Sequence, residues 1–188
     1  MEKRTVASRI EHLEPCSEAY EWAKRYTSPE KAWAECQRGD WLLWLLGKRA
    51  GAPESEARKR LVLCACSCAR LALPHTKDVR VSTCIETAEK WAKGETTIEQ
   101  LRGARAVAYA AYAAEHYAAP AAAEAAEAAY AAAATAYTAI EAAYAAAAAG
   151  YAAAYAAAAT AARYRVLEKC ADIVRKHYPR PPKVTKGG

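Results

Sequence analysis

Residues 120–163 form a segment built almost entirely of alanine, interrupted by a few tyrosines and threonines and by three glutamates. Alanine is the strongest helix former, so the segment predicts helix. Continued to Tyr178 as one straight helix, it would be roughly 88 Å long at about 1.5 Å per residue. A compact chain of this size has a radius of gyration of only about 16 Å. The segment must therefore fold back on itself or project as a rod that pairs with another chain.

Gly150 is the only glycine between Gly103 and Gly187, so we expect a hairpin of two alanine helices that breaks near it. Between residues 128 and 162 the only charged side chain is Glu141. A helix without charges on its surface must be covered on most sides to stay in solution. The first half of the chain offers limited cover, which favours an intersubunit bundle and predicts a homo-oligomer.

The tyrosines of this segment recur every seven residues, at Tyr130, Tyr137, Tyr144 and Tyr151. A strict sevenfold period marks one stripe on a helix and favours left-handed packing against a neighbour. Two interpretations stay open. The stripe either fills a core or interface, or lines a narrow aromatic slot that holds a purine or a partner helix.

Helix signals also dominate the rest of the chain, and strand signals are almost absent. Ser28 and Pro29 have the pattern of a helix cap followed by a first-turn proline. Asp40 is expected to cap the next helix, whose residues 41–46 are apolar on every side and predict a buried centre. The fold class is therefore all-α, a helical bundle. We expect a Trp/Leu-rich part at 1–97, alanine/tyrosine-rich helices at 98–178 as the same domain or an oligomerisation extension, and a disordered basic tail at 179–188.

The formal net charge of +6 and the isoelectric point near 8.9 favour anionic partners. The seven cysteines are odd in number and show no regular framework, which indicates reduced thiols. The alanine-rich stretch lacks the Leu, Ile and Val of a membrane span. With no targeting segment visible, we expect a cytoplasmic protein without a membrane partner.

The sequence offers little that predicts catalysis or metal binding. On a helix, Cys64 and Cys68 share a face while Cys66 points elsewhere, so the three thiols cannot share one ion. The four histidines fit no catalytic spacing, and neither a nucleophile elbow nor a phosphate-binding glycine loop occurs. We therefore expect a protein that is not an enzyme and holds no cofactor and no metal.

Arginines flank the alanine segment on both sides. A hairpin would bring Arg163 and Arg165 near Arg102 and Arg105, and clustered guanidiniums suit phosphate recognition. The alternative is that they are solvated helix ends. Together with the tyrosines they form the predicted ligand site: Arg102, Arg105, Tyr109, Tyr112, Tyr137, Tyr144, Tyr151, Arg163 and Arg165.

Two stretches resemble a known family. Residues 77–80 (KDVR), 84–95 (CIETAEKWAKGE) and the alanine run that follows are similar to the type-five-like immunity proteins, found beside bacterial polymorphic toxins and in phage genomes. Residues 32–45 are similar to their phage-borne branch. The chain departs from the family at Val79, where a proline is usual, and in carrying tyrosines where histidines are frequent. The resemblance implies an all-α fold, neutralisation of a target by binding, and a location in a bacterial cell or a phage-infected host.

The leading hypothesis is a non-catalytic inhibitor of the immunity or phage counter-defence type, which binds a protein toxin or effector stoichiometrically. A second is an oligomeric sponge that sequesters an anionic, nucleotide-like signalling molecule. A third is a structural helical assembly protein. Nucleic acid is not expected as a partner.

Overall fold

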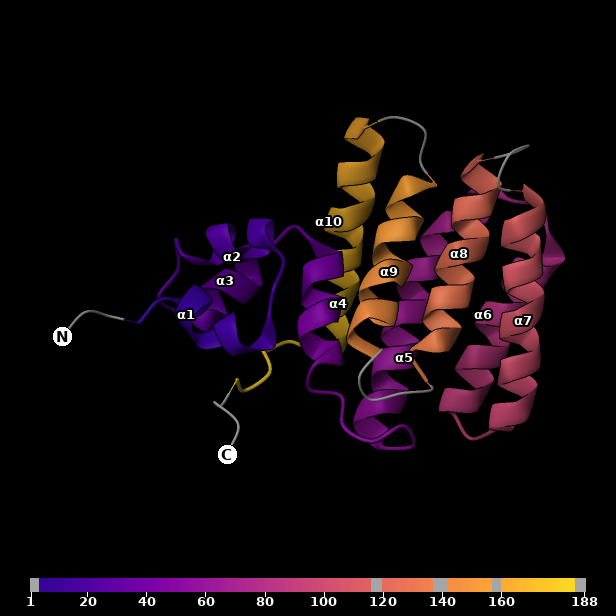
Figure 1. Cartoon of the computed structure of the whole chain (residues 1–188), viewed down its shortest axis with the longest axis horizontal. Helices are drawn as coiled ribbons and strands as arrows, with labels where there is room; N and C mark the ends of the chain where they lie inside the picture. Colours follow the sequence, from indigo (N-terminus) through magenta and orange to yellow (C-terminus); the bar gives the residue numbers. More distant parts are fainter. Residues whose placement is uncertain (1–3, 116–119, 137–141, 157–159, 185–188) are drawn as a thin grey trace.

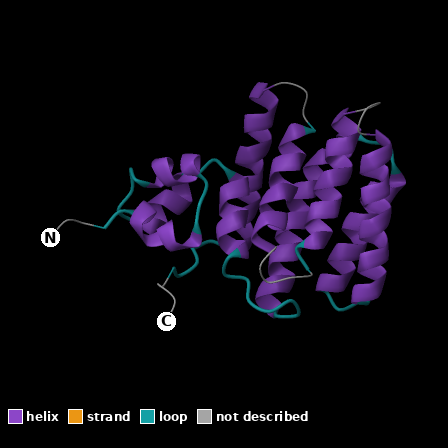
Figure 2. Cartoon of the chain, in the orientation of Figure 1, coloured by secondary structure: helices purple, strands orange, loops and turns teal. Residues whose placement is uncertain are grey.

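The computed structural model describes residues 4–115, 120–136, 142–156 and 160–184. Within these ranges every regular element is a helix, which confirms the all-α prediction (Figure 2). The α-helices are α1 Val6–Ile10, α2 Ser17–Ala23, α3 Pro29–Glu35, α4 Gly39–Gly47, α5 Glu56–Ala69, α6 Val79–Ala92, α7 Ile98–Glu115, α8 Pro120–Ala134, α9 Ala142–Tyr155 and α10 Thr160–His177. Two 3₁₀-helices, η1 Glu11–Leu13 and η2 Arg70–His75, complete the described elements. None of the described helices combines the length and apolar character needed to cross a membrane.

The helices fall into a large bundle and a small group at one end (Figure 1). Helices α4 to α10 lie roughly side by side, with α4 and α10 at one side and α6 and α7 at the other. The short helices α1, α2 and α3 gather beyond α4, and the first and last described segments of the chain lie on that side of the molecule. Residues from the two ends of the sequence therefore meet beside α4.

The start of α3 follows the predicted cap. Ser28 accepts a hydrogen bond from the amide of Lys31, and Pro29 occupies the first turn. Asp40 is not the cap of the next helix, and that prediction was wrong. Helix α4 already begins at Gly39. Helix α10 crosses Gly39 so closely that a Cβ there would collide with Cys170, so glycine is required at this position. Asp40 instead lies inside the first turn and is buried.

The alanine segment folds back on itself, but not where glycine predicts. Helix α8 ends at Ala134 and α9 begins at Ala142, so the turn precedes Gly150. Gly150 lies inside α9 at its crossing with α4. A Cβ there would be 3.1 Å from Cδ1 of Leu43 and 3.6 Å from the backbone of Asp40. The glycine thus allows a close helix crossing, and the prediction of a hairpin at Gly150 was wrong.

The alanine faces of α8 are covered within the chain itself. Nine alanines of α8 are buried, and seven of them join one apolar cluster with residues of α5, α6, α7 and α9. This cluster draws on both the 1–97 and the 98–178 parts of the sequence. The expectation that α8 needs a second subunit to cover it therefore does not hold, although a homo-oligomer stays a prediction.

Candidate functional site

The predicted arginine and tyrosine residues do not converge on one site. Arg102, Arg105, Tyr109 and Tyr112 lie on α7, whereas Arg163 and Arg165 lie on α10, at the opposite side of the bundle (Figure 1). The proposed approach of the two arginine pairs was therefore wrong, because α8 and α9 pack between these helices. The two end members of the tyrosine stripe, Tyr130 on α8 and Tyr151 on α9, belong to separate helices. Two further predicted residues cannot be placed in full: Tyr144 lies on α9 but its side chain is outside the described part, and Tyr137 is outside the described residues.

On α7 the predicted residues form an aromatic cluster with α8. Nη2 of Arg105 donates a 2.5 Å hydrogen bond to the hydroxyl of Tyr130, and its guanidinium lies 4.5 Å from the centre of that ring. The Tyr109 ring packs 5.5 Å from Tyr130 and 6.2 Å from Tyr112. Arg105 is half-buried in this cluster while Arg102 is exposed. These contacts hold α7 against α8 at the outer edge of the bundle.

A second cluster joins α9 to α10. The rings of Tyr151 and Tyr155 stack at 4.3 Å with 30° between their planes, and the guanidinium of Arg163 lies 4.4 Å from the centre of the Tyr155 ring. The hydrogen bond with Tyr155, helped by partial burial, raises the pKa of the Tyr151 hydroxyl to about 12. Arg165 is exposed beyond it. The stack pins the start of α10 to α9.

The cysteines of α5 divide between two cores, as the helical spacing predicts. Cys64 and Cys68 are buried with Cys170 of α10, while Cys66 is buried in the alanine-rich cluster beside Ile85. Hydrogen bonds with the Cys170 and Cys64 thiols, together with burial, raise the pKa of Cys68 well above its ordinary value. Among the described residues no three His, Cys, Asp or Glu side chains come together as a metal cluster.

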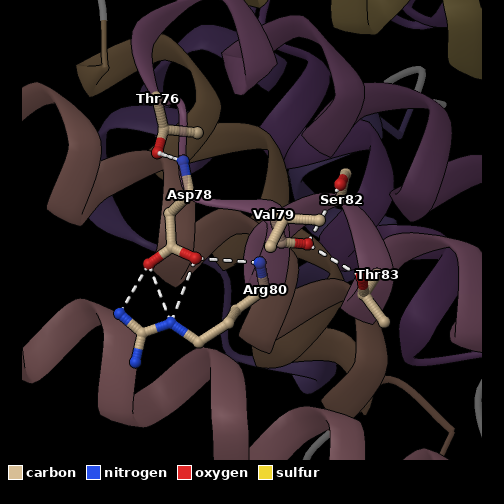
Figure 3. Close-up of polar contacts among 6 residues, drawn as sticks. All are labelled: Thr76, Asp78, Val79, Arg80, Ser82 and Thr83. Atoms are coloured by element: carbon tan, nitrogen blue, oxygen red, sulfur yellow. Dashed lines mark hydrogen bonds and ion pairs between the residues drawn. The ribbon is translucent and has the colours of Figure 1, made fainter.

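The KDVR stretch, which carries part of the family resemblance, forms the start of α6 (Figure 3). The carboxylate of Asp78 caps this helix, accepting a 2.8 Å bond from the amide of Arg80 and a 2.6 Å bond from its guanidinium. The hydrogen bonds from Arg80 hold the pKa of Asp78 below its ordinary value. Val79, where the family usually has proline, is exposed at the first helical position. The stretch therefore has a local structural role, because Asp78 and Arg80 are paired with each other.

A hollow in the described structure lies between the short helices α1–α3 and α4. It is a cavity of about 370 Å³ that opens to the surface. Four of the five tryptophans of the chain line it, and most of the remaining wall is aliphatic. Its lining residues are Val6, Arg9, Ile10, Ala19, Trp22, Ala23, Pro29, Glu30, Ala32, Trp33, Cys36, Trp41, Leu42, Trp44, Leu45, Pro181, Pro182, Lys183 and Val184. We refer to it as the tryptophan cavity.

The four tryptophans differ in how firmly they are held. Trp33 is 4% exposed, and its indole N–H donates a 3.0 Å bond to the carbonyl of Tyr178. Trp22 and Trp41 pack edge to face at 6.0 Å, and both contact the buried clusters. Trp44 is partly exposed and lies outside the buried clusters that the described residues form. Trp33 therefore supports the wall, whereas Trp44 is partly exposed, with the Lys48 ammonium 5.5 Å from the centre of its ring.

The ionisable side chains on the wall do not form a reactive group. They are Arg9, Glu30, Cys36 and Lys183. Burial raises the pKa of the Cys36 thiol to about 11, so it stays protonated near neutral pH and is a poor nucleophile. Hydrogen bonds from its own backbone amide and from the Ser28 hydroxyl hold the pKa of Glu30 below its ordinary value. This wall suits the uptake of an apolar or aromatic group.

No known protein family matches this chain. Comparison with curated proteins and with solved structures found no similar protein either. The likeness to the type-five-like immunity proteins therefore remains a hypothesis that rests on the residues quoted for it.

The sequence reasoning missed the tryptophan cavity, although a signal was present. Four of the five tryptophans fall between residues 22 and 44, a density that a small core does not need. The tail at 179–188 was expected to be disordered and basic. Its described part, residues 179–184, instead contributes Pro181, Pro182 and Val184 to the cavity wall. Proline and valine bury apolar surface there. The prediction of a disordered tail was based on its charged residues and did not consider these apolar ones.

Proposed function

We propose that this chain is a non-catalytic binding protein of the inhibitor type, which grips a partner protein through the tryptophan cavity. The observation that carries the proposal is the cavity itself: about 370 Å³, open to the surface and walled by four tryptophans and by aliphatic side chains. Tryptophan is among the residues that contribute most at protein interfaces, and such anchors cluster in well-packed pockets.

The chemistry of the wall favours a protein anchor over a nucleotide. Pockets for small molecules span about 300–1,000 Å³, so this cavity is near the small end and suits one or two large apolar side chains. An anionic nucleotide needs convergent cationic donors around its phosphates. The wall offers Arg9 and Lys183, together with the carboxylate of Glu30. The arginines expected to form a phosphate site are on opposite sides of the bundle.

The resemblance to immunity proteins supports the same class of function. Such a protein neutralises a toxin or effector by binding it, without turnover, and needs a surface that recognises one partner. In the present chain the tryptophan cavity is the described feature best suited to that task. Inhibition by stoichiometric binding is therefore the mechanism we propose, with a protein toxin or effector as the target.

The experiment compares three forms of the full chain, purified under native conditions from the cells that carry its gene. We expect the unchanged chain to retain one protein partner at a fixed ratio in native mass spectrometry. Trp44→Ala should lose at least tenfold in partner affinity with an unchanged circular dichroism spectrum. Tyr164→Ala is the matched control, because it removes an exposed aromatic ring (61% exposed) that does not line the cavity.

The outcomes separate the competing functions. Equal partner binding by Trp44→Ala and the unchanged chain would contradict the assignment of the cavity. A nucleotide recovered in place of a protein would support the sponge. An unchanged oligomer with neither ligand would favour a structural assembly role.

A further inference from the structure

The last described segment of the chain forms part of the tryptophan cavity. After α10 ends at His177, the chain leaves the bundle and runs to the α1–α3 side (Figure 1). Pro181, Pro182 and Lys183 line the cavity beside the tryptophans, and Val184 packs against the small cluster formed by Ala7, Ile10 and Ala23. We call residues 179–184 the C-terminal strap.

The strap is firmly anchored at its beginning. The carbonyl of Tyr178 accepts the indole N–H of Trp33 at 3.0 Å, and its ring lies 4.6 Å from the guanidinium of Arg60. Beyond this point the described strap residues make neither a hydrogen bond nor an ion pair. Packing alone holds them on the wall. A segment without backbone hydrogen bonds belongs to the least stable part of a fold and can detach at low cost in free energy.

The composition of the strap indicates what this surface recognises. Three of its six residues are proline, at positions 179, 181 and 182. Proline has a fixed φ and no amide hydrogen, so such a segment is extended in advance and loses little entropy on docking. Grooves lined by aromatic side chains are the surfaces that bind such segments in other proteins. Here four tryptophans and a proline-rich segment of the same chain line one cavity.

We infer that the tryptophan cavity is a groove for an extended, proline-rich segment of the partner protein, and that the strap is its intramolecular occupant. The strap fills only part of the groove, because about 370 Å³ stays open beside it. A partner segment binds by entering this space and displacing Pro181 and Pro182. This inference rests on the proposed function and adds the chemistry of the partner to it.

Competition from the strap sets the strength of binding. A tethered occupant acts at an effective concentration in the millimolar range. A free peptide of the same chemistry must therefore bind the unchanged chain weakly, and must bind more tightly once the strap is impaired. Weakening the strap without removing it leaves the rest of the chain intact for the measurement.

The experiment uses the full chain and a capped peptide, Pro-Arg-Pro-Pro-Lys-Val, which repeats the strap. The peptide has no tryptophan, so tryptophan emission reports on the protein. We expect P181A/P182A to bind the peptide at least tenfold more tightly than the unchanged chain does. The matched control, Arg180→Ala, alters an exposed strap residue and should leave the affinity unchanged. A peptide with both of its adjacent prolines replaced by alanine should not bind.

A second measurement needs no variant of the protein. Titration of the peptide into the unchanged chain should shift the indole N–H NMR signals of Trp22, Trp41 and Trp44. The signal of Trp91 should stay in place, because Trp91 lies in the alanine-rich cluster and does not line the cavity.

Equal peptide affinity in P181A/P182A and the unchanged chain, or equal binding of the alanine peptide, overturns the inference. So do indole signals that do not move. If a partner protein is retained in a Trp44-dependent manner while the peptide neither binds nor competes, the proposed function stands and only the proline-rich partner is wrong. If the peptide binds but no protein partner is retained, the groove for proline-rich segments stands and the proposed inhibitor function is wrong.

Discussion

Helices α8 and α4 are both buried in the bundle, but α8 buries small side chains and α4 buries large ones. The buried face of α8 consists of alanines, whose small methyl groups let neighbouring helices approach to about 8 Å. Helix α4 carries leucines and tryptophans, and its partly exposed residues Trp41, Trp44 and Leu45 line the cavity. The alanine methyl groups of α8 are covered by neighbouring helices, whereas the larger rings of α4 border the tryptophan cavity.

Opposite kinds of substitution should therefore destabilise the two regions. Around α4, stability depends on large side chains being present, so truncation is the damaging change. Around α8, stability depends on large side chains being absent, so enlargement is the damaging change. The following tests range from the largest expected effect to the smallest.

Trp33→Ala should have the largest effect. It removes a ring that is 4% exposed and leaves the carbonyl of Tyr178 without its indole donor. Truncation of a buried tryptophan costs about 3–5 kcal/mol of unfolding free energy. Urea denaturation followed by circular dichroism measures the loss. Trp44→Ala, the matched change at the partly exposed cavity wall, should cost clearly less, and equal losses would contradict the distinction drawn between the two residues.

Ala129→Leu should be next. Ala129 is fully buried in α8, and its carbonyl accepts a 3.6 Å contact from the thiol of Cys84. Leucine is nearly as good a helix former as alanine, so the expected loss of about 1–3 kcal/mol reflects overpacking alone. The control is Ala110→Leu at an exposed site of α7, which should change stability by less than about 0.5 kcal/mol. A tolerated leucine at 129 would show that α8 is loosely packed.

The buried thiols predict how stability depends on pH in each region. Burial raises the pKa of Cys36, near α4, to about 11 and that of Cys84, against α8, to about 12. Both folded-state values lie above the ordinary thiol value of 9.0, so the protonated form is favoured on folding. Their contribution is complete below pH 9 and is lost as the pH rises through the folded-state value. At pH 10 each thiol should cost about 1 kcal/mol relative to pH 8.

The check is denaturation of the unchanged chain, Cys36→Ala and Cys84→Ala at pH 8 and pH 10. Each variant should lose less stability over this interval than the unchanged chain does. Identical losses in all three proteins would mean that these thiols are not protected by burial.

Tyr130→Phe should have the smallest effect. It removes the hydroxyl that accepts from Arg105 and keeps the ring on which the guanidinium packs. A hydrogen bond of this kind contributes about 0.5–1.5 kcal/mol. Tyr164→Phe, which changes an exposed tyrosine (61% exposed) on α10, is the control and should be neutral. Thermal unfolding of both variants, combined with Arg105→Ala in a double-mutant cycle, isolates the pair.

Several features were predictable because the signals for them are local. The Ser28–Pro29 start of α3 depends only on neighbouring residues. The division of Cys64 and Cys68 from Cys66 follows from helical geometry alone. By contrast, the stop expected at Gly150 and the cap expected at Asp40 were wrong. At Gly150 and at Gly39, which precedes Asp40, the neighbouring element is a helix from a distant part of the sequence, and its close approach decides what glycine does there.

The candidate site was the least predictable part. The spacing of tyrosines and arginines indicated a slot, but the two arginine pairs lie on opposite sides of the bundle. An alanine run is nearly identical at every register, so the sequence contains little information about where it turns or which helix it meets.

By itself, the sequence determined that this protein is helical, because alanine content, caps and helical periodicity act over a few residues. Only the tertiary structure decided that residues 22–44 and the C-terminal strap enclose one cavity. That juxtaposition joins segments more than one hundred residues apart in the 188-residue chain, and it arises from the packing of α10 against α4. Contacts of such range depend on how whole helices fit together, which no local pattern specifies.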